Sequence, residues 1–189
     1  MTDYSAIILA GGKSRRMGQK KGTLLFQGKT FLDIIIDKLR DMGISEIMIS
    51  GYSYKSEGTI YVEDMYPNKG PLAGVHAGLS IASNSSVLVL TEDAPLIPAE
   101  YIRQMMEEYE KHLSPVTVAS CADRLQHFPG IYEKSLAPLC ESILQSERPT
   151  VMSLIEKSGC SSVPFYGDEM VIRGCNTPAE YEQVMNFTI

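Results

Sequence analysis

The chain has 189 residues, of which 44% are hydrophobic and 21% charged, and this composition is typical of a globular protein rather than of a disordered one. Its 17 Lys and Arg residues against 23 Asp and Glu residues give a formal net charge of −6. Such an acidic balance disfavours a nucleic-acid binder, which needs a basic surface. No apolar run reaches the ~18 residues of a membrane span. We therefore expect one domain over residues 1–189, in the cytoplasm, without a nucleic-acid or membrane partner.

The cysteines indicate a reducing compartment. They stand at positions 121, 140, 160 and 175 without a C-x-x-C pair, and only three histidines are available to complete a zinc site. We therefore expect four reduced thiols and no structural zinc.

Apolar residues occur in short continuous runs and in stretches with helical spacing. Up to residue 112, we expect strands at residues 4–10, 44–50, 59–63 and 87–90 and helices at residues 30–42, 72–82 and 99–112. Beyond it, we expect strands at 116–119, 130–132, 163–166 and 170–173 and helices at 136–145, 151–157 and from residue 178. This alternation predicts an α/β fold with a mainly parallel central sheet covered on both faces. Ligands of such sheets bind beyond the carboxyl ends of the strands, so the residues that follow each strand are candidate site residues.

A loop rich in glycine and cationic residues follows the first expected strand. Between Gly11 and Gly22 the chain carries five Lys and Arg residues, although it is acidic overall. Glycine lets backbone N–H groups turn toward an anion. Each charge-assisted hydrogen bond adds ~1.5–3 kcal/mol, whereas a helix dipole adds only ~0.3–1 kcal/mol. The loop predicts a phosphate cradle, but not a P-loop, because the Walker spacing would need glycine in place of Ile7 or Thr23.

Two carboxylates follow expected strands at the same edge of the sheet. Asp64 follows the third strand and Asp93 the central one, and Mg²⁺ usually takes one or two carboxylates together with phosphate oxygens and water. Asp64 is almost as well explained as a turn residue. Asp93 could cap the next helix, but Pro95 intervenes, so a role as metal ligand is favoured. We expect the neighbouring Glu92 to point to solvent or toward a cation of the loop.

Two later motifs have at least a partial local explanation. Gly74 lies inside the expected helix 72–82, where glycine costs ~1 kcal/mol, and we expect it to let the backbone approach a ligand. Near the end of the chain, Thr177 as N-cap, Pro178 as first helical residue and Glu180 at the third form a capping box. The box accounts for this motif without a functional role for Asn176.

Five motifs resemble the molybdenum cofactor guanylyltransferase family, within the wider nucleotidyltransferases, over nearly the whole chain. They are L-A-G-G-x-S-x-R-M-G-x-x-K (residues 9–21), E-D (63–64), G-P-L-A-G (70–74), D-x-P-x-x-P (93–98) and N-T-P-x-E (176–180). The resemblance implies a three-layer Rossmann-like fold with a nucleotide-binding half over about residues 1–100 and an acceptor half over about 101–189. It also implies transfer of GMP from GTP to the terminal phosphate of Mo-molybdopterin, with Mg²⁺ as cofactor and pyrophosphate released. Transient contact with molybdoenzyme maturation proteins is a further implied partnership.

The resemblance assigns roles to individual residues. Asp93 would bind Mg²⁺, Lys21 would contact the phosphates, and Arg16 would lie near the triphosphate or the acceptor phosphate; these three are the expected catalytic residues. The other expected members of the nucleotide site are Leu9, Ala10, Gly11, Gly12, Ser50 and Asp64. The expected acceptor contacts are Gly74, Arg148 and Asn176.

Three positions depart from the family pattern and keep other functions open. Ser50 stands where a base-reading Asn is usual, Lys20 where an acidic residue is common, and Glu92 where a small residue or Cys is usual. A molybdopterin cytidylyltransferase or another small-molecule nucleotidyltransferase is therefore the alternative enzyme. An alternative of another class is a regulatory nucleotide-binding module or a cofactor carrier. Lys21 and Asp93 together argue against the module, because binding alone does not require an activated α-phosphate.

Overall fold

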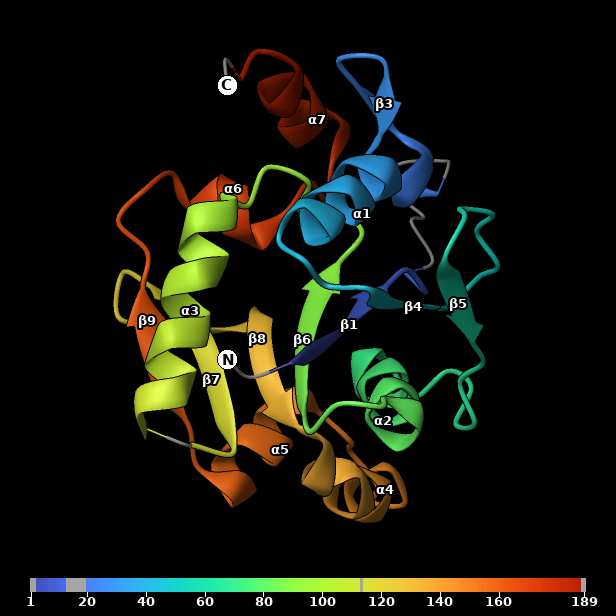
Figure 1. The fold of residues 1–189 in the computed structure, drawn as a ribbon, viewed down its shortest axis with the longest axis vertical. Helices are drawn as coiled ribbons and strands as arrows, with labels where there is room; N and C mark the ends of the chain where they lie inside the picture. The colour runs from blue at the N-terminus through green and yellow to red at the C-terminus, as the bar shows by residue number, and fades with distance from the viewer. Residues whose placement is uncertain (1–2, 13–19, 113, 188–189) are drawn as a thin grey trace.

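A seven-stranded sheet organises the computed structural model, which describes residues 3–12, 20–112 and 114–187 (Figure 1). The strand order is β5-β4-β1-β6-β8-β7-β9. The bounds are β1 (Tyr4–Leu9), β4 (Glu46–Ser50), β5 (Thr59–Val62), β6 (Ser86–Thr91), β7 (Val116–Cys121), β8 (Arg124–Glu133) and β9 (Ser161–Pro164). Within the described residues, β8 alone runs against the other strands of this sheet. The predicted α/β fold with a mainly parallel sheet is thus confirmed.

The register of the central strands determines where the site can form. Leu9, the last residue of β1, pairs with Ser50 of β4 on one side and with Thr91 of β6 on the other. The carboxyl ends of these three parallel strands therefore lie side by side. Parallel strands need crossover connections, so the loops that follow them all emerge at this one edge.

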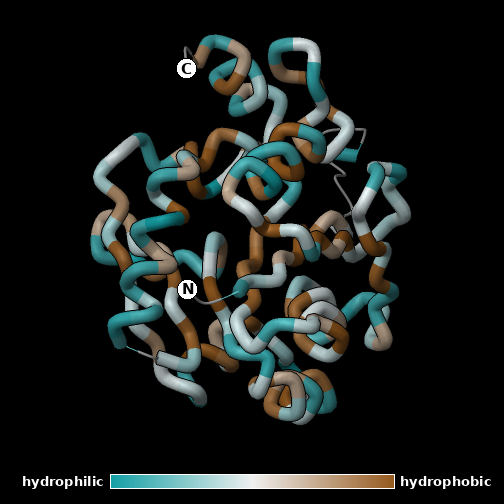
Figure 2. The backbone as a smooth tube through the Cα atoms, viewed as in Figure 1, coloured by the Kyte–Doolittle hydropathy of each residue, from teal (hydrophilic) through white to brown (hydrophobic). Residues whose placement is uncertain are grey.

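Helices cover both faces of the sheet, and the alternation of side chains along β1 shows how. Ala6 and Ile8 belong to a core cluster with α1 (Phe31–Asp41), α3 (Ala99–His112) and α6 (Glu169–Arg173). Ile7 and Leu9 belong to a second cluster with α2 (Pro71–Ile81), α4 (Ala137–Leu144) and α5 (Val151–Ser158). Each fully buried Ile or Leu contributes ~1.5–3 kcal/mol, so burial on both faces fixes the sheet between two helical layers. Figure 2 shows the hydrophobic residues concentrated in the central strands and hydrophilic residues along α3.

A third, smaller cluster joins the two ends of the chain. The short helix η1 (Lys21–Thr23) leads into a hairpin of β2 (Leu25–Phe26) and β3 (Lys29–Thr30), and α7 (Pro178–Met185) packs against it (Figure 1). Phe31 and Val184 are buried in this contact, and the Tyr181 hydroxyl donates to the Leu25 carbonyl at 2.8 Å. The segment that precedes α7 is thereby held close to η1.

The structure corrects the expected elements at three places. Residues 170–173 form helix α6 instead of a strand, because the Asp168 carboxylate accepts from the Met170 N–H at 3.0 Å and caps a helical turn. The β2–β3 hairpin was not predicted; its turn uses positive φ angles at Gln27 and Gly28. β8 extends well beyond the expected residues 130–132.

The capping box near the end of the chain is confirmed. Thr177 accepts from the Glu180 N–H at 3.3 Å, and the Glu180 carboxylate accepts from the Asn176 N–H at 2.7 Å, so the capping box is present. The four cysteines are free thiols. Within the described ranges, no three His, Cys, Asp or Glu side chains lie together in a way that could hold a metal. None of the helices described has the length and apolar character that crossing a bilayer requires.

Candidate active site

A cavity of about 440 Å³ lies at the carboxyl ends of β1, β4 and β6. Eight of the residues that were expected in the site line it: Leu9, Gly11, Gly12, Lys21, Ser50, Asp64, Gly74 and Asp93. Ala10 is buried directly behind this lining, where its N–H donates to the Ser50 carbonyl at 2.9 Å. The position of the cavity follows from the topology, because it forms where consecutive parallel strands release their loops.

Lys21 and Asp93 form an ion pair inside this cavity. The Lys21 Nζ lies 2.8 Å from the Asp93 Oδ2, and the two side chains are only 12% and 15% exposed. Lys21 comes from η1 and Asp93 from the end of β6, so the pair connects the glycine-rich segment to the central strand. Partial burial limits screening by solvent and makes this pair stronger than a surface ion pair.

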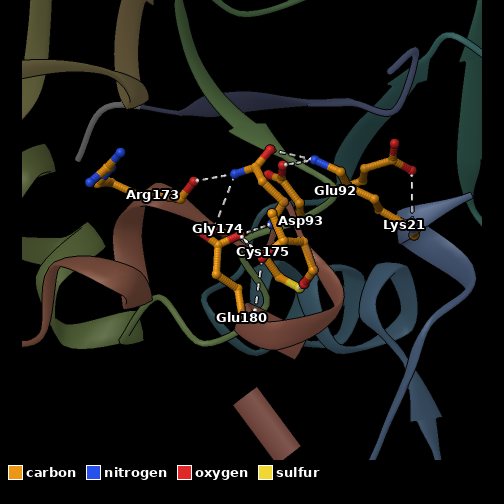
Figure 3. A network of polar contacts seen from close by, with 10 residues as sticks. Lys21, Glu92, Asp93, Arg173, Gly174, Cys175 and Glu180 are labelled. Atoms are coloured by element: carbon orange, nitrogen blue, oxygen red, sulfur yellow. Dashed lines mark hydrogen bonds and ion pairs between the residues drawn. The ribbon is translucent and has the colours of Figure 1, made fainter. Parts of the chain in front are cut away.

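Asn176 is the second partner of Lys21. Its Oδ1 accepts from the Lys21 Nζ at 2.6 Å, and its Nδ2 donates to the Gly174 carbonyl at 3.2 Å. The amide is thus oriented with its oxygen toward the cation. Asn176 also contacts Glu180 through its N–H, and Figure 3 shows the network that includes Lys21, Asp93, Gly174 and Glu180. The expectation that the capping box explains this motif without Asn176 was incomplete, because Asn176 lies in the site.

The segment before α7 also contacts the backbone of Asp93. The Cys175 N–H donates to the Asp93 carbonyl at 2.8 Å. At Gly174, where φ is +74°, an added Cβ would lie only 2.6 Å from the Asp93 Oδ1. A side chain at position 174 would therefore displace the carboxylate. Asp93 does not cap the following helix, in agreement with the expectation that it serves the site.

Lys38 supports the loop that follows Asp93. Its Nζ donates to the carbonyls of Pro95 at 2.7 Å and of Ile97 at 2.5 Å. The two carbonyls lie in a loop and, among the described residues, have no backbone N–H donor of a helix or strand. The Lys38 ammonium donates to them instead. Burial lowers the pKa of Lys38 to about 8. Sequence reasoning missed this residue because its spacing in α1 is that of an ordinary exposed position.

Asp64 lies on the other side of the cavity, after β5. Its Oδ1 is buried and has no hydrogen-bond partner among the residues that the structure describes. Burial raises the pKa of this carboxyl above its ordinary value. A buried acceptor without a donor costs free energy of folding. The Asp64 Oδ1 is therefore available to accept a hydrogen bond from a ligand in the cavity.

The expectation that Glu92 points either to solvent or toward a cation of the loop was wrong in its first alternative. The side chain is 4% exposed and does not point to solvent; its Oε2 accepts from the Gly22 N–H at 2.9 Å and from the Tyr52 hydroxyl at 3.1 Å. Burial raises the pKa of Glu92 to about 7, against the opposing effect of these hydrogen bonds. One feature of the sequence pointed to this position: Glu92 directly follows a buried strand and directly precedes Asp93, so it lies at the strand end beside the site.

The N-terminal turn of α2 closes the cavity opposite η1. Gly74 lies so close to β1 and β4 that an added Cβ would lie 2.5 Å from the Ser50 Oγ and 2.8 Å from the Leu9 Cδ2. Glycine at this position therefore allows the helix to approach the strand ends. Gly70 and Pro71 also line the cavity, and the free N–H groups of a helix N-terminus favour anions.

Two expected residues are not placed in this arrangement. Arg16 lies outside the described residues. Arg148 is exposed in the segment between α4 and α5 and does not line the cavity. Five lining residues were not among the expected site residues: Asn68, Gly70, Pro71, Thr91 and Glu92. Thr91 and Glu92 lie at the end of β6 and follow from the strand-end rule, whereas no pattern in the sequence marks Asn68.

Comparisons with known proteins agree with this geometry. The model of the MobA-like NTP transferase domain family matches residues 6–161. A probable molybdenum cofactor guanylyltransferase from Carboxydothermus hydrogenoformans is 29% identical, with 98% of this chain and 96% of that protein covered. A probable molybdenum cofactor guanylyltransferase from Clostridium perfringens is 35% identical over 78% of this chain and 72% of its own length.

A solved structure shares the fold. It is the molybdopterin-guanine dinucleotide biosynthesis protein A from Archaeoglobus fulgidus, with a TM-score of 0.80, 19% sequence identity and 96% of each chain covered. The family match over most of the chain, together with the cavity at the strand ends, establishes the class of protein. The chain belongs to the MobA-like NTP transferase domain family and is a nucleotidyltransferase.

Proposed function

We propose that this protein transfers GMP from GTP to the terminal phosphate of Mo-molybdopterin. The acceptor phosphate attacks the α-phosphorus of GTP, and the bond to the bridging oxygen of pyrophosphate breaks. The relatives are named for this guanylyl transfer. The observation that carries the proposal is the cavity lined by Lys21, Asp64 and Asp93, in which the Lys21 ammonium contacts both Asp93 and Asn176.

Lys21 is the residue that we expect to hold the phosphates. Lys21 lines the cavity, and its ammonium donates to the carboxylate of Asp93 and to the amide oxygen of Asn176. Phosphate transfer needs positioning and charge stabilisation rather than covalent chemistry by the protein. An ammonium fixed by two oxygens is pre-organised to donate to phosphate oxygens as negative charge develops on them.

Asp93 is the residue that we expect to hold Mg²⁺. The fit rests on the donor set: Asp93 already receives a cation, the Lys21 Nζ, and Asp64 lines the same cavity. Mg²⁺ prefers one or two carboxylates with phosphate oxygens and water over a cage of protein ligands, which suits this pair. When bound, the ion would neutralise charge on the triphosphate. The backbone carbonyl of Asp93 accepts from the Cys175 N–H, so its carboxylate projects from a fixed position.

Asp64 and Ser50 are the residues that we expect to contact the nucleoside. The unused Oδ1 of Asp64 accepts a hydrogen bond from a ribose hydroxyl or a base N–H. Ser50 lies at the end of β4, next to Leu9 and Gly11 in the lining. We propose the same nucleotide site for Ala10 and Gly12, and a phosphate role for Arg16.

For the acceptor we propose contacts from Gly74, Asn176 and Arg148. Gly74 lines the cavity and Asn176 contacts Lys21, which supports a role for these two, whereas Arg148 is proposed from the α4–α5 segment. The terminal phosphate of Mo-molybdopterin would accept from a cation such as Lys21. A cytoplasmic location and transient contact with molybdoenzyme maturation proteins remain predictions from the sequence.

A nucleotide panel tests the proposal. The protein is incubated with Mg²⁺, Mo-molybdopterin and, in turn, GTP, CTP, ATP or UTP, and pyrophosphate release is measured. We expect release with GTP at least ~100-fold faster than with the other nucleotides, because a site that hydrogen-bonds one base rejects another strongly. Release with CTP alone would identify a cytidylyltransferase. Binding of nucleotide without release would favour the regulatory module or carrier.

A further inference from the structure

Glu92 is a buried carboxylate that the proposed reaction does not use. It follows β6 directly and precedes Asp93, and its own N–H donates to the Leu9 carbonyl at 3.1 Å. Its backbone is therefore fixed to the central strands. Its side chain turns toward η1, where the Oε2 accepts from the Gly22 N–H and from the Tyr52 hydroxyl.

Gly22 packs against this carboxylate without room to spare. An added Cβ at Gly22 would lie 2.7 Å from the Glu92 Oε2, 2.6 Å from the Tyr52 Oη and 2.7 Å from the Leu32 Cγ. Real side-chain atoms do not approach this closely. The backbone of η1 is thus held between Glu92, Tyr52 and α1 at the residue immediately after Lys21.

The residue before Lys21 is held by the same group. The Lys20 Nζ lies 3.8 Å from the centroid of the Tyr52 ring, a distance typical of a cation–π contact. Tyr52 therefore contacts Lys20 through its ring and Glu92 through its hydroxyl. Both flanks of Lys21 are tied to the Tyr52–Glu92 pair.

We propose that Glu92 is a positioning residue: with Tyr52, it holds the backbone of Lys20–Gly22 so that the ammonium of Lys21 stays in the cavity beside Asp93. This inference rests on the proposed function of Lys21 as the phosphate-binding cation. Asp93 and Glu92 are consecutive, so the end of β6 fixes Lys21 twice, at its ammonium through Asp93 and at its backbone through Glu92. Glu92 lines the cavity, and its Oε2 is used as an acceptor by the Gly22 N–H and the Tyr52 hydroxyl, so the role assigned to it acts through the backbone next to Lys21.

If Glu92 acts as a hydrogen-bond acceptor, its substitution by Ala and by Gln should have different effects on kcat. Glu92→Ala removes the acceptor and leaves the Gly22 N–H and the Tyr52 hydroxyl without a partner, and we expect kcat to fall about 10–100-fold, as for other losses of alignment near 1 Å. Glu92→Gln retains an acceptor oxygen, and we expect it to recover most of that loss, to within about 3-fold. Glu100→Ala, which removes an exposed carboxylate from α3, is the matched control.

A double-mutant cycle tests whether Glu92 acts through Lys21. In the Lys21→Ala background, Glu92→Ala should lower kcat by less than about 2-fold, because the group that it positions is gone. Additive losses in the cycle would overturn the proposal, and so would a Glu92→Gln variant as impaired as Glu92→Ala, which would show that the charge itself acts. If Glu92→Ala does not fold, Tyr52→Phe replaces it in the same cycle with the same criterion.

The cycle is measured on two readouts so that it does not depend on turnover alone. Pyrophosphate release with GTP and Mo-molybdopterin gives kcat, and isothermal titration gives the Kd of Mg·GTP for each variant. A wild-type protein that binds GTP but releases no pyrophosphate would refute the proposed function. The cycle on Kd would then still decide the role of Glu92, because coupling between Glu92 and Lys21 in GTP affinity supports it and additivity overturns it.

Discussion

Lys21 and Asp93 form an ion pair with 2.8 Å between the ammonium nitrogen and the carboxylate oxygen. A divalent cation that approaches Asp93 alone meets this ammonium at the same oxygen. A nucleotide offers Lys21 new acceptors in its phosphates, so the metal and the triphosphate are expected to bind together rather than in sequence.

We predict that Lys21→Ala strengthens binding of Mg²⁺ in the absence of nucleotide. Removal of a competing ammonium should lower the Kd of the free ion about 3–10-fold, since a partly exposed ion pair contributes about 1 kcal/mol. Isothermal titration with Mg²⁺ measures this. Lys29→Ala is the control, because Lys29 pairs with Asp37 at an exposed position away from the cavity. Equal affinities in wild type and Lys21→Ala would contradict the competition.

The same substitution should have the opposite effect on turnover. Without the ammonium, charge on the triphosphate is less stabilised in the transition state, and we expect kcat to fall ~10²–10³-fold, as for the loss of one pre-organised donor. Steady-state pyrophosphate release measures it, again with Lys29→Ala as control. Unchanged turnover would remove Lys21 from the mechanism.

Gly174→Ala tests how Asp93 is held. The new Cβ would lie 2.6 Å from the Asp93 Oδ1 and would sit at a φ of +74°. Gly159→Ala is a matched control, because Gly159 has a φ of +76° and nothing within 4 Å of an added Cβ. Both variants should lose about 1–3 kcal/mol of stability from backbone strain, because a positive φ with an extended ψ is a conformation essentially restricted to glycine. Gly174→Ala alone should also raise the Mg²⁺ concentration needed for half-maximal activity; an identical requirement in both variants would argue against contact with Asp93.

Lys38 gives a prediction about pH. Burial lowers its pKa to about 8 in the folded protein from an ordinary value of 10.5. Between these values the unfolded chain binds the proton that the folded protein has already lost, so the free energy of unfolding rises with pH from about 8 to 10.5. At about 1.4 kcal/mol per pH unit, the full contribution over this interval is about 3–4 kcal/mol.

Urea unfolding at pH 7 and pH 9.5 measures this contribution. Other lysines and tyrosines titrate in the same range, so the quantity to compare is the difference between wild type and Lys38→Met. We expect the rise to be smaller in the variant. A parallel rise in both proteins would show that Lys38 titrates near its ordinary value.

Sequence patterns located the site better than they described its contacts. The order of strands and loops predicted that Leu9, Asp64 and Asp93 would meet at one edge of the sheet, because carboxyl ends of neighbouring parallel strands must do so. The contact between Lys21 and Asn176 was not predictable in this way. These residues are 155 positions apart, and their meeting depends on how α7 packs on the β2–β3 hairpin.

Local patterns were also misleading where tertiary contacts decide the outcome. Residues 170–173 have the β-branched composition of a strand, yet the Asp168 cap and burial of Val171 and Ile172 against the sheet make them a helix. A carboxylate at the end of a strand, such as Glu92, is usually exposed. Here the Gly22 N–H and the Tyr52 hydroxyl donate to it, and the side chain is buried. The division into a nucleotide half and an acceptor half stays a prediction, although Asn176 reaches Lys21 across it.

The packing of α7 on the β2–β3 hairpin has consequences for the synthesis of the protein and for its sensitivity to proteolysis. The segment around α7 holds Asn176 against Lys21, which precedes it by 155 positions in the chain. A growing polypeptide therefore lacks this contact until α7 has been synthesised and has docked. For the same reason, a protease that trims this tail should silence the protein while leaving the sheet intact.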